Sequence, residues 1–177
     1  NSVAAIALAW LNGVTKEEIR TAMVSYSGIY RRFNLVFRSE QTIFMDDYAH
    51  HPKELKASIL SIKELFPGKK ITGIFQPNLY SRTRDFAIDF AEVLSLLDEL
   101  ILLDIYPARE EPIEGVSSEM IFRNVKLENK TLCSRENLLS LLKDRHPEVL
   151  VTFGAGDIDK LVPLIKKQLM EQTNGNA

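Results

Sequence analysis

The sequence predicts an α/β protein with a doubly wound, mostly parallel sheet that is covered by helices on both faces. Short apolar runs alternate with helical stretches along most of the chain, which is the order expected of parallel strands joined by crossover helices. These runs are apolar at every position, as is required of strands that are buried on both faces. Of the 177 residues, 45% are hydrophobic and 26% are charged, a composition typical of a soluble globular protein.

The composition also excludes several classes of protein. No apolar run approaches the ~20 residues that a membrane-spanning helix needs. A net charge of −2 provides no overall basic field that would attract nucleic acid. The single cysteine, Cys133, has no partner for an intramolecular disulfide and fits a small hydrophobic side chain in a strand. A reducing compartment fits best, and we expect a cytoplasmic protein that binds neither membrane nor nucleic acid.

The first 30 residues are predicted to form two helices that precede the sheet. The first helix is apolar and ends at Gly13. Thr15 is the expected N-cap of the second, followed by Glu17 and Glu18 in the turn where the helix dipole favours anions. The chain opens without a methionine or a signal-peptide pattern, so we expect part of a longer protein. A change to β-rich sequence places a domain boundary near residue 30, which gives units 1–30 and 31–177.

The second unit carries the predicted sheet, and each element in it has a local signal. Its strands are runs of apolar and β-branched residues such as Ile71–Phe75 and Val149–Phe153, and Pro67-Gly68 ends the first of its helices. The last four residues are expected to be a frayed tail. The predicted strands cover 34–38, 41–45, 71–75, 100–103, 130–133 and 149–153, and the predicted helices cover 53–65, 81–97, 118–122, 136–143 and 157–171.

Most of the unusual polar residues follow directly after predicted strands. In an open parallel sheet, ligands bind in the crevice beyond the carboxyl ends of the strands. The convergence of these loops on one edge is therefore the strongest argument for a functional site. The loops are Asp46–Pro52, Gln76–Asp85, Asp104–Glu110 and Gly154–Asp157.

Arginines suggest anion binding at two places. Arg82 and Arg84 fall in the first turn of a predicted helix, where the dipole disfavours cations unless an anion compensates; a solvated first turn is the alternative. Arg31 and Arg32 lie at the domain boundary, where they could reach a phosphate or form a plain surface pair.

The remaining loop residues have simpler alternatives. Asp46-Asp47 could be a strand terminus with a helix cap, and no metal site is predicted at His50-His51, because adjacent side chains point apart and no cysteine completes it. Gly154-Ala155-Gly156-Asp157 lacks the third glycine of a dinucleotide fingerprint, so we interpret it as a tight turn that could also touch a ligand. The sequence contains no phosphate-binding P-loop, nucleophile elbow or zinc-protease motif.

Three segments in this order resemble the carboxy-terminal domain of the Mur ligases, the ATP-dependent amide-forming enzymes of bacterial peptidoglycan synthesis and cell-wall biogenesis. They are Asp46–Pro52, Phe75–Pro77 with Tyr80–Asp85, and Asp104–Glu110. The resemblance covers essentially the whole chain and implies a Rossmann-like domain that closes over the active site. Residues 1–30 look like the end of the family's central ATPase domain.

Within that family the motifs are most similar to those of the members that join L-alanine to UDP-N-acetylmuramate through an acyl phosphate. The resemblance implies that ATP and Mg²⁺ are bound mainly by the central domain, and that this chain alone is inactive. Two alternatives remain: the recycling ligase that attaches a preformed peptide to the same sugar, and a non-catalytic nucleotide- or carboxylate-binding module.

The resemblance also implies roles for individual residues. Asn1, Arg32, Asp47 and Tyr48 match residues close to the nucleotide, with Arg32 directed at the ATP phosphates and Asp47 helping to organise the closed site. Together with His50, Arg32 and Asp47 are the expected catalytic residues.

A second group matches the family's binding site for the amino-acid carboxylate. His50, Arg82 and, less closely, Arg84 correspond to that site. The sequence departs from the family at Asn78, where a histidine is usual; this bears on the role of that side chain and leaves the assignment of the arginines untouched.

Overall fold

The computed structural model describes the backbone of residues 2–26 and 28–175 and divides the chain into two compact units, 1–30 and 31–177. The first unit contains α1 (Ser2–Leu11) and α2 (Lys16–Ser25). Thr15 caps α2 as predicted, because its hydroxyl accepts a hydrogen bond from the Glu18 N–H while its own N–H donates to the Glu18 carboxylate. Neither of these two described helices contains a buried residue.

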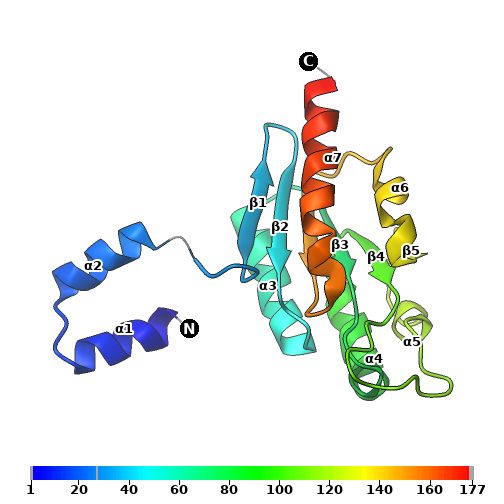
Figure 1. The fold of residues 1–177 in the computed structure, drawn as a ribbon, viewed down its shortest axis with the longest axis horizontal. Helices are drawn as coiled ribbons and strands as arrows, with labels where there is room; N and C mark the ends of the chain where they lie inside the picture. The colour runs from blue at the N-terminus through cyan, green and yellow to red at the C-terminus, as the bar shows by residue number, and fades with distance from the viewer. Residues whose placement is uncertain (1, 27, 176–177) are drawn as a thin grey trace. The chain divides into compact units, whose positions relative to one another are not determined.

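The second unit is built on a six-stranded sheet with the strand order β1-β2-β6-β3-β4-β5, which Figure 1 shows. Every neighbouring pair is parallel except β1 and β2, which form an antiparallel pair at one edge. The fold class predicted from the sequence is therefore confirmed. The strands are β1 (Asn34–Arg38), β2 (Ile43–Asp47), β3 (Ile71–Phe75), β4 (Glu99–Leu103), β5 (Lys130–Cys133) and β6 (Val149–Phe153).

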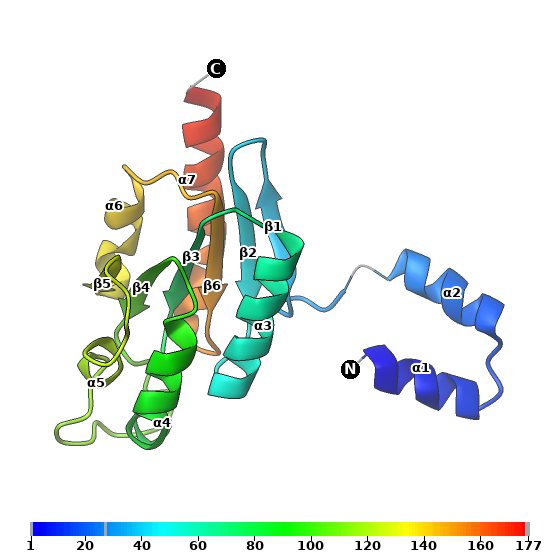
Figure 2. The ribbon, with the colours of Figure 1, turned by 180° about the vertical axis from the view of Figure 1, so that it is seen from behind.

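Helices cover both faces of the sheet, as Figures 1 and 2 show from opposite sides. One face packs against α3 (Pro52–Leu65), α4 (Tyr80–Leu94) and α5 (Glu119–Phe122). The other packs against α6 (Leu138–Leu142) and α7 (Val162–Gly175), which follow the short 3₁₀ helices Arg135–Asn137 and Asp157–Lys160.

Strand β2 shows how one strand serves both layers. Ile43 and Met45 join the core under α3 and α4, whereas Phe44 joins the core under α7. All five residues of β2 are buried, including the two aspartates at its end. The side chains of a strand alternate between the two faces, so the last two residues of β2 must also point to opposite sides.

Several element boundaries differ from the predicted ones. Helix α4 ends at Leu94 and not at residue 97, because the chain turns there to reach β4, and Asp98 accepts a hydrogen bond from the N–H of Ile71 at 2.9 Å. The two helices predicted from 136 and 157 open with 3₁₀ turns, a common form of a helix start. The expected frayed tail is wrong in part, since α7 continues to Gly175; residues 176–177 lie outside the described part.

No helix within residues 2–26 and 28–175 has both the length and the apolar character needed to cross a membrane.

Candidate functional site

The candidate site lies at the carboxyl ends of strands β2, β3, β4 and β6. Asp46 and Asp47 were predicted to follow a strand, but they are the last two residues of β2. The predicted strand end at residue 45 was wrong and the alternative of a strand terminus was right, because parallel pairing with β6 continues to the end of β2, where Asp46 lies beside Thr152 and Asp47 beside Phe153. Both carboxylates are buried, so each must find polar partners within the fold.

Asp46 points to the α7 face and forms a buried network. Its Oδ2 accepts from Arg31 Nε at 3.2 Å, and its Oδ1 accepts from the Thr152 hydroxyl at 2.7 Å. Burial raises the pKa of Asp46, and the hydroxyl of Thr152 and the Arg31 charge oppose this rise without cancelling it. Arg31 is thus neither a surface residue nor free to reach a phosphate.

Asp47 points to the opposite face and is held by two donors. The hydroxyl of Ser58 on α3 donates to Oδ2 at 2.5 Å, and the backbone N–H of Ala49 donates to Oδ1 at 3.2 Å. Asp47 and Ser58 line a pocket of about 290 Å³ together with Arg32. The structure therefore brings together two of the residues expected near a nucleotide, Arg32 and Asp47.

The other two predicted nucleotide residues are placed differently. The ring of Tyr48 lies under two guanidinium groups, with centroid distances of 5.1 Å to Arg31 and 5.4 Å to Arg32, so it supports the arginines. Asn1 lies outside the described residues.

The two adjacent histidines do different work. The Nδ1–H of His50 donates to the carbonyl of Tyr48 at 2.9 Å and lies 3.3 Å from Glu54 Oε2. His51 is the N-cap of α3, accepting from Lys53 N–H at 3.3 Å, and its ring packs edge-on against Phe86 of α4. The helix cap considered for the aspartates is therefore supplied by His51. No group of three or more metal-ligating side chains occurs within the described residues.

Glu54 fixes the turn between β2 and α3. Its carboxylate accepts from the backbone N–H groups of His50 at 3.1 Å and His51 at 3.3 Å. Burial raises the pKa of Glu54, but these two hydrogen bonds and the neighbouring His50 outweigh it, so the pKa lies below its usual value. The loop that carries His50 is thereby held to the helix that follows it.

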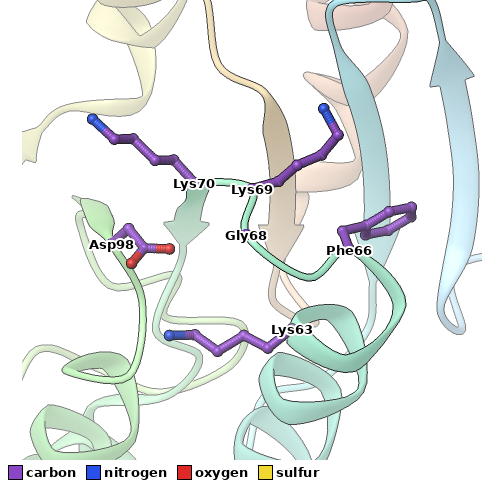
Figure 3. Close-up of a pocket in the computed structure, with 6 residues that line it drawn as sticks. All are labelled: Lys63, Phe66, Gly68, Lys69, Lys70 and Asp98. Carbon is purple, nitrogen blue, oxygen red and sulfur yellow. The ribbon is translucent and has the colours of Figure 1, made fainter.

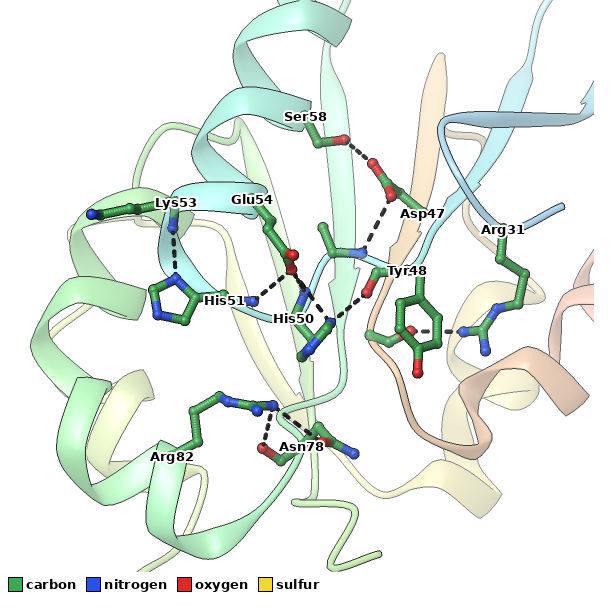
Figure 4. A network of polar contacts seen from close by, with 12 residues as sticks. Arg31, Asp47, Tyr48, His50, His51, Lys53, Glu54, Ser58, Asn78 and Arg82 are labelled. Atoms are coloured by element: carbon green, nitrogen blue, oxygen red, sulfur yellow. Dashed lines mark hydrogen bonds and ion pairs between the residues drawn. The ribbon is translucent and has the colours of Figure 1, made fainter. Parts of the chain in front are cut away.

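Arg82 lies in the first turn of α4 and points toward His50, as Figure 4 shows. Its Nη1 donates to the side-chain oxygen of Asn78 at 3.2 Å. Asn78, the position at which the sequence departs from the family pattern, therefore contacts Arg82 directly. Within the described residues no carboxylate lies within ion-pair distance of Arg82, although its charge helps to lower the pKa of Glu110.

Arg84 lies elsewhere. Its Nε pairs with the neighbouring Asp85 at 2.8 Å, and both side chains are about half exposed, at 51%. Two residues along a helix differ by about 200° in direction, so Arg82 and Arg84 cannot share one face. Arg84 lines a separate pocket with Ile88 and Arg123. The structure does not bring Arg84 to the site of Arg82 and His50.

Comparisons with known proteins address the identity of this fold and site. The family described as "Mur ligase, glutamate ligase domain" matches residues 31–157. The chain belongs to the Mur ligase family. It is 58% identical over 172 residues to the UDP-N-acetylmuramate–L-alanine ligase of Parabacteroides distasonis, covering 97% of this chain and 37% of that protein.

Other relatives agree with this assignment. A ligase of the same name from Porphyromonas gingivalis is 54% identical over 170 residues, covering 96% of this chain and 37% of that protein. The solved UDP-N-acetylmuramate–alanine ligase of Thermotoga maritima has a TM-score of 0.75 at 24% identity, covering 99% of this chain and 37% of that structure. This Mur ligase chain thus spans about 37% of the length of the curated relatives it matches.

The Mur ligase domain contains hydrogen bonds around the candidate site that its sequence does not predict. Glu110 accepts from the backbone N–H of Ser81 at 2.9 Å and from its hydroxyl, so it caps α4 from 29 residues away. Gln76 is buried and links two loops, donating to Asp157 and accepting from the Ile158 N–H, each at 2.9 Å. Neither contact has a local sequence signal, because its partners meet only in the folded sheet.

The Gly154–Asp157 segment is a tight turn that a neighbouring loop approaches. A Cβ at Gly156 would lie 2.5 Å from the side-chain oxygen of Gln76 and 2.7 Å from Tyr106. Gly154 has φ +145°, and a Cβ there would lie 2.9 Å from the backbone oxygen of Gln76. Both glycines are therefore required by close packing of the β6 loop against the loops that follow β3 and β4 in this Mur ligase domain.

A further pocket, of about 270 Å³, lies at the opposite edge of the sheet. Figure 3 shows that the ammonium groups of its three lysines point in different directions, and Lys69 pairs with Glu148 at 3.7 Å. The cations do not converge on one point, so the polar residues at the carboxyl edge remain the candidate site. The lining residues are Lys63, Phe66, Gly68, Lys69, Lys70 and Asp98.

The Glu110 contact predicts a pH-dependent stability. The hydroxyl and the backbone N–H of Ser81 lower the pKa of Glu110 from its usual value of 4.5, so the folded state favours the ionised carboxylate. Its stabilising contribution is present above pH 4.5 and is lost as the pH falls through the lowered pKa. Glu110→Gln should flatten the loss of stability between about pH 5 and pH 3, measured by urea unfolding. Glu111→Gln is the matched control, and an equal flattening in both variants would contradict the assignment.

Proposed function

We propose that this chain is the carboxy-terminal domain of an ATP-dependent ligase that joins L-alanine to UDP-N-acetylmuramate. The observation that carries the proposal is the pair of Arg82 and His50, which extend toward one another from the first turn of α4 and from the loop that precedes α3 (Figure 4). Identity of 58% to a ligase of that name supports the choice of substrates. The proposed location is the cytoplasm, where nucleotide substrates are available.

The guanidinium of Arg82 is suited to hold the carboxylate of the incoming amino acid. Its planar fork can form two parallel hydrogen bonds to a carboxylate, and it stays charged at every working pH. Asn78 Oδ1 holds one end of that fork at 3.2 Å without neutralising it. His50 contributes from the facing loop, and since its Nδ1 is occupied by the Tyr48 carbonyl, Nε2 is the nitrogen available to a ligand.

The pocket of Arg32 and Asp47 is suited to the nucleotide. Arg32 offers a cation to the phosphates, and Asp47 offers a carboxylate to ribose hydroxyls, held in place by Ser58 at 2.5 Å. Mg²⁺ would supply charge neutralisation during phosphoryl transfer, and we assign its ligands to the central domain, because the described residues contain no suitable cluster.

The carboxylate site and the nucleotide site serve different steps of amide formation. Transfer of the γ-phosphoryl group to the lactyl carboxylate gives an acyl phosphate, and the alanine amine must then lie within about 3–3.5 Å of the acyl carbon. Closure of this domain would deliver the amine through the Arg82 site and exclude water from the acyl phosphate.

Residues 1–30 are proposed to be the end of the central ATPase domain. The exposed fraction is 63% for Leu8, 60% for Trp10 and 79% for Leu11, although α1 is almost entirely apolar. Such a helix needs a partner surface, which the remainder of a central domain would supply.

The carboxylate site predicts a substrate-selective effect of Arg82→Lys in the full-length ligase. Lysine keeps the charge but loses the fork, so kcat/KM for alanine should fall by about 10- to 150-fold, corresponding to the ~1.5–3 kcal/mol of a charge-assisted hydrogen bond. The KM for ATP should change little. Steady-state kinetics with each substrate varied in turn provide the measurement.

Arg84→Lys is the matched control, since Arg84 lies two residues away on the same helix and pairs with Asp85. It should leave both constants near those of the parent enzyme. Equal losses for alanine and ATP in Arg82→Lys would indicate failed domain closure, and no loss would refute the carboxylate site.

The nucleotide site predicts that Asp47→Asn impairs turnover while the domain stays folded. The amide can still accept from Ala49 N–H and donate to Ser58, but the charge is lost, and kcat should fall by about 100-fold or more. Thermal unfolding should remain close to that of the parent. Asp89→Asn, at an exposed position of α4, controls for loss of a carboxylate. Near-parental activity of Asp47→Asn would leave Asp47 a purely structural residue.

A further inference from the structure

Arg31 opens the second unit and is buried, with only 8% of its surface exposed. All three nitrogens of its guanidinium have a polar partner. Nε donates to Asp46 Oδ2 at 3.2 Å, Nη2 donates to the carbonyl of Gly154 at 2.7 Å, and Nη1 lies 3.6 Å from Asp159 Oδ2. The side chain of Arg31 therefore connects the backbone directly before Arg32 to the carboxyl ends of β2 and β6.

The backbone around Arg32 is held in an unusual conformation. Arg31 has φ +60° and Phe33 has φ +50°, both in the left-handed region that residues other than glycine rarely adopt. The carbonyl of Arg31 accepts from the N–H of Tyr48 at 2.6 Å, which fixes this segment to the loop after β2. Strained residues of this kind persist where surrounding contacts over-determine them, and Arg31 has such contacts to Asp46, Gly154 and Tyr48 at the carboxyl ends of the strands.

The two arginines match the two aspartates of β2. Arg31 pairs with Asp46 on the α7 face, whereas Arg32 and Asp47 line the same pocket on the α3 face. Neighbouring residues of a strand face opposite sides of the sheet. Arg31 and Asp46 can therefore hold the backbone on one side, while Arg32 and Asp47 line the pocket on the other.

We infer that Arg31 is a positioning residue, which through its buried pairing with Asp46 holds Arg32 over the pocket that it shares with Asp47. This inference rests on the proposed function, in which Arg32 meets the ATP phosphates. A lysine at position 31 would keep the charge but could not contact Asp46 and Gly154 in two directions, since an ammonium lacks the rigid fork. Arg32 would then lose its fixed direction although its own side chain is unchanged.

A double-mutant cycle in the full-length ligase tests this coupling, with kcat/KM for ATP as the readout. R31K should lower that constant about tenfold in the parent background, but less than about twofold when R32A has already removed the residue it positions. R145K alters the ion pair of Arg145 and Glu99 at the amino end of β4, and its effect on kcat/KM for ATP should be the same with and without R32A. If R31K fails to fold, T152V, which removes the hydroxyl donor to Asp46, enters the same cycle.

Equal losses from R31K in both backgrounds, or no loss in either, would overturn the positioning role. The proposed function is tested separately by the unsubstituted enzyme, which must release ADP in an alanine-dependent manner. If the unsubstituted enzyme lacks this activity, the proposed function is refuted. Equal losses in the two backgrounds of the cycle instead refute only the positioning role of Arg31.

Discussion

The alternation of side chains at the end of β2 is the constraint on which the rest of the site depends. Asp46 and Asp47 are adjacent, so the pleat directs one carboxylate under α7 and the other under α3. Burying Asp46 is costly, as its raised pKa shows, and Arg31 and Thr152 offset that cost. Removing one partner of such a buried pair typically costs about 3–5 kcal/mol, because the remaining charge is left uncompensated.

The parallel sheet also brings loops that are far apart in the sequence together at the carboxyl ends of its strands. The β3 loop is tied to the β4 loop by the hydrogen bonds from Tyr106 N–H to Pro77 and from Leu79 N–H to Tyr106, at 2.8 and 3.0 Å. It is tied to the β6 loop through Gln76. Arg82 thus lies in a first turn of α4 that is supported from both sides, which suits its proposed role of holding a carboxylate in one orientation.

Local patterns were sufficient for much of the fold. The apolar runs placed the strands to within about two residues, and Thr15 was identified as a cap from its sequence neighbours alone. The site edge also followed from the rule for parallel sheets. Strand order did not, because β6 pairs with β2 and β3 through residues that are far from it in the sequence.

Individual roles within the site needed the folded chain. Arg82 and Arg84 look equivalent in the sequence, but helical geometry separates them and Asp85 pairs with only one. The burial of Arg31 depends on Gly154, which lies 123 residues away. Asn78 was identified as a departure from the family pattern, but its contact with Arg82 emerges only when the β3 loop meets α4.

A crystal structure of the full-length ligase with an unreactive ATP analogue and L-alanine tests the central claim most directly. We expect the alanine carboxylate within hydrogen-bonding distance of Arg82 and His50, with Arg32 facing the phosphates and Arg31 still paired with Asp46, as the proposed carboxylate site requires. Alanine bound without contact to either Arg82 or His50 would contradict it.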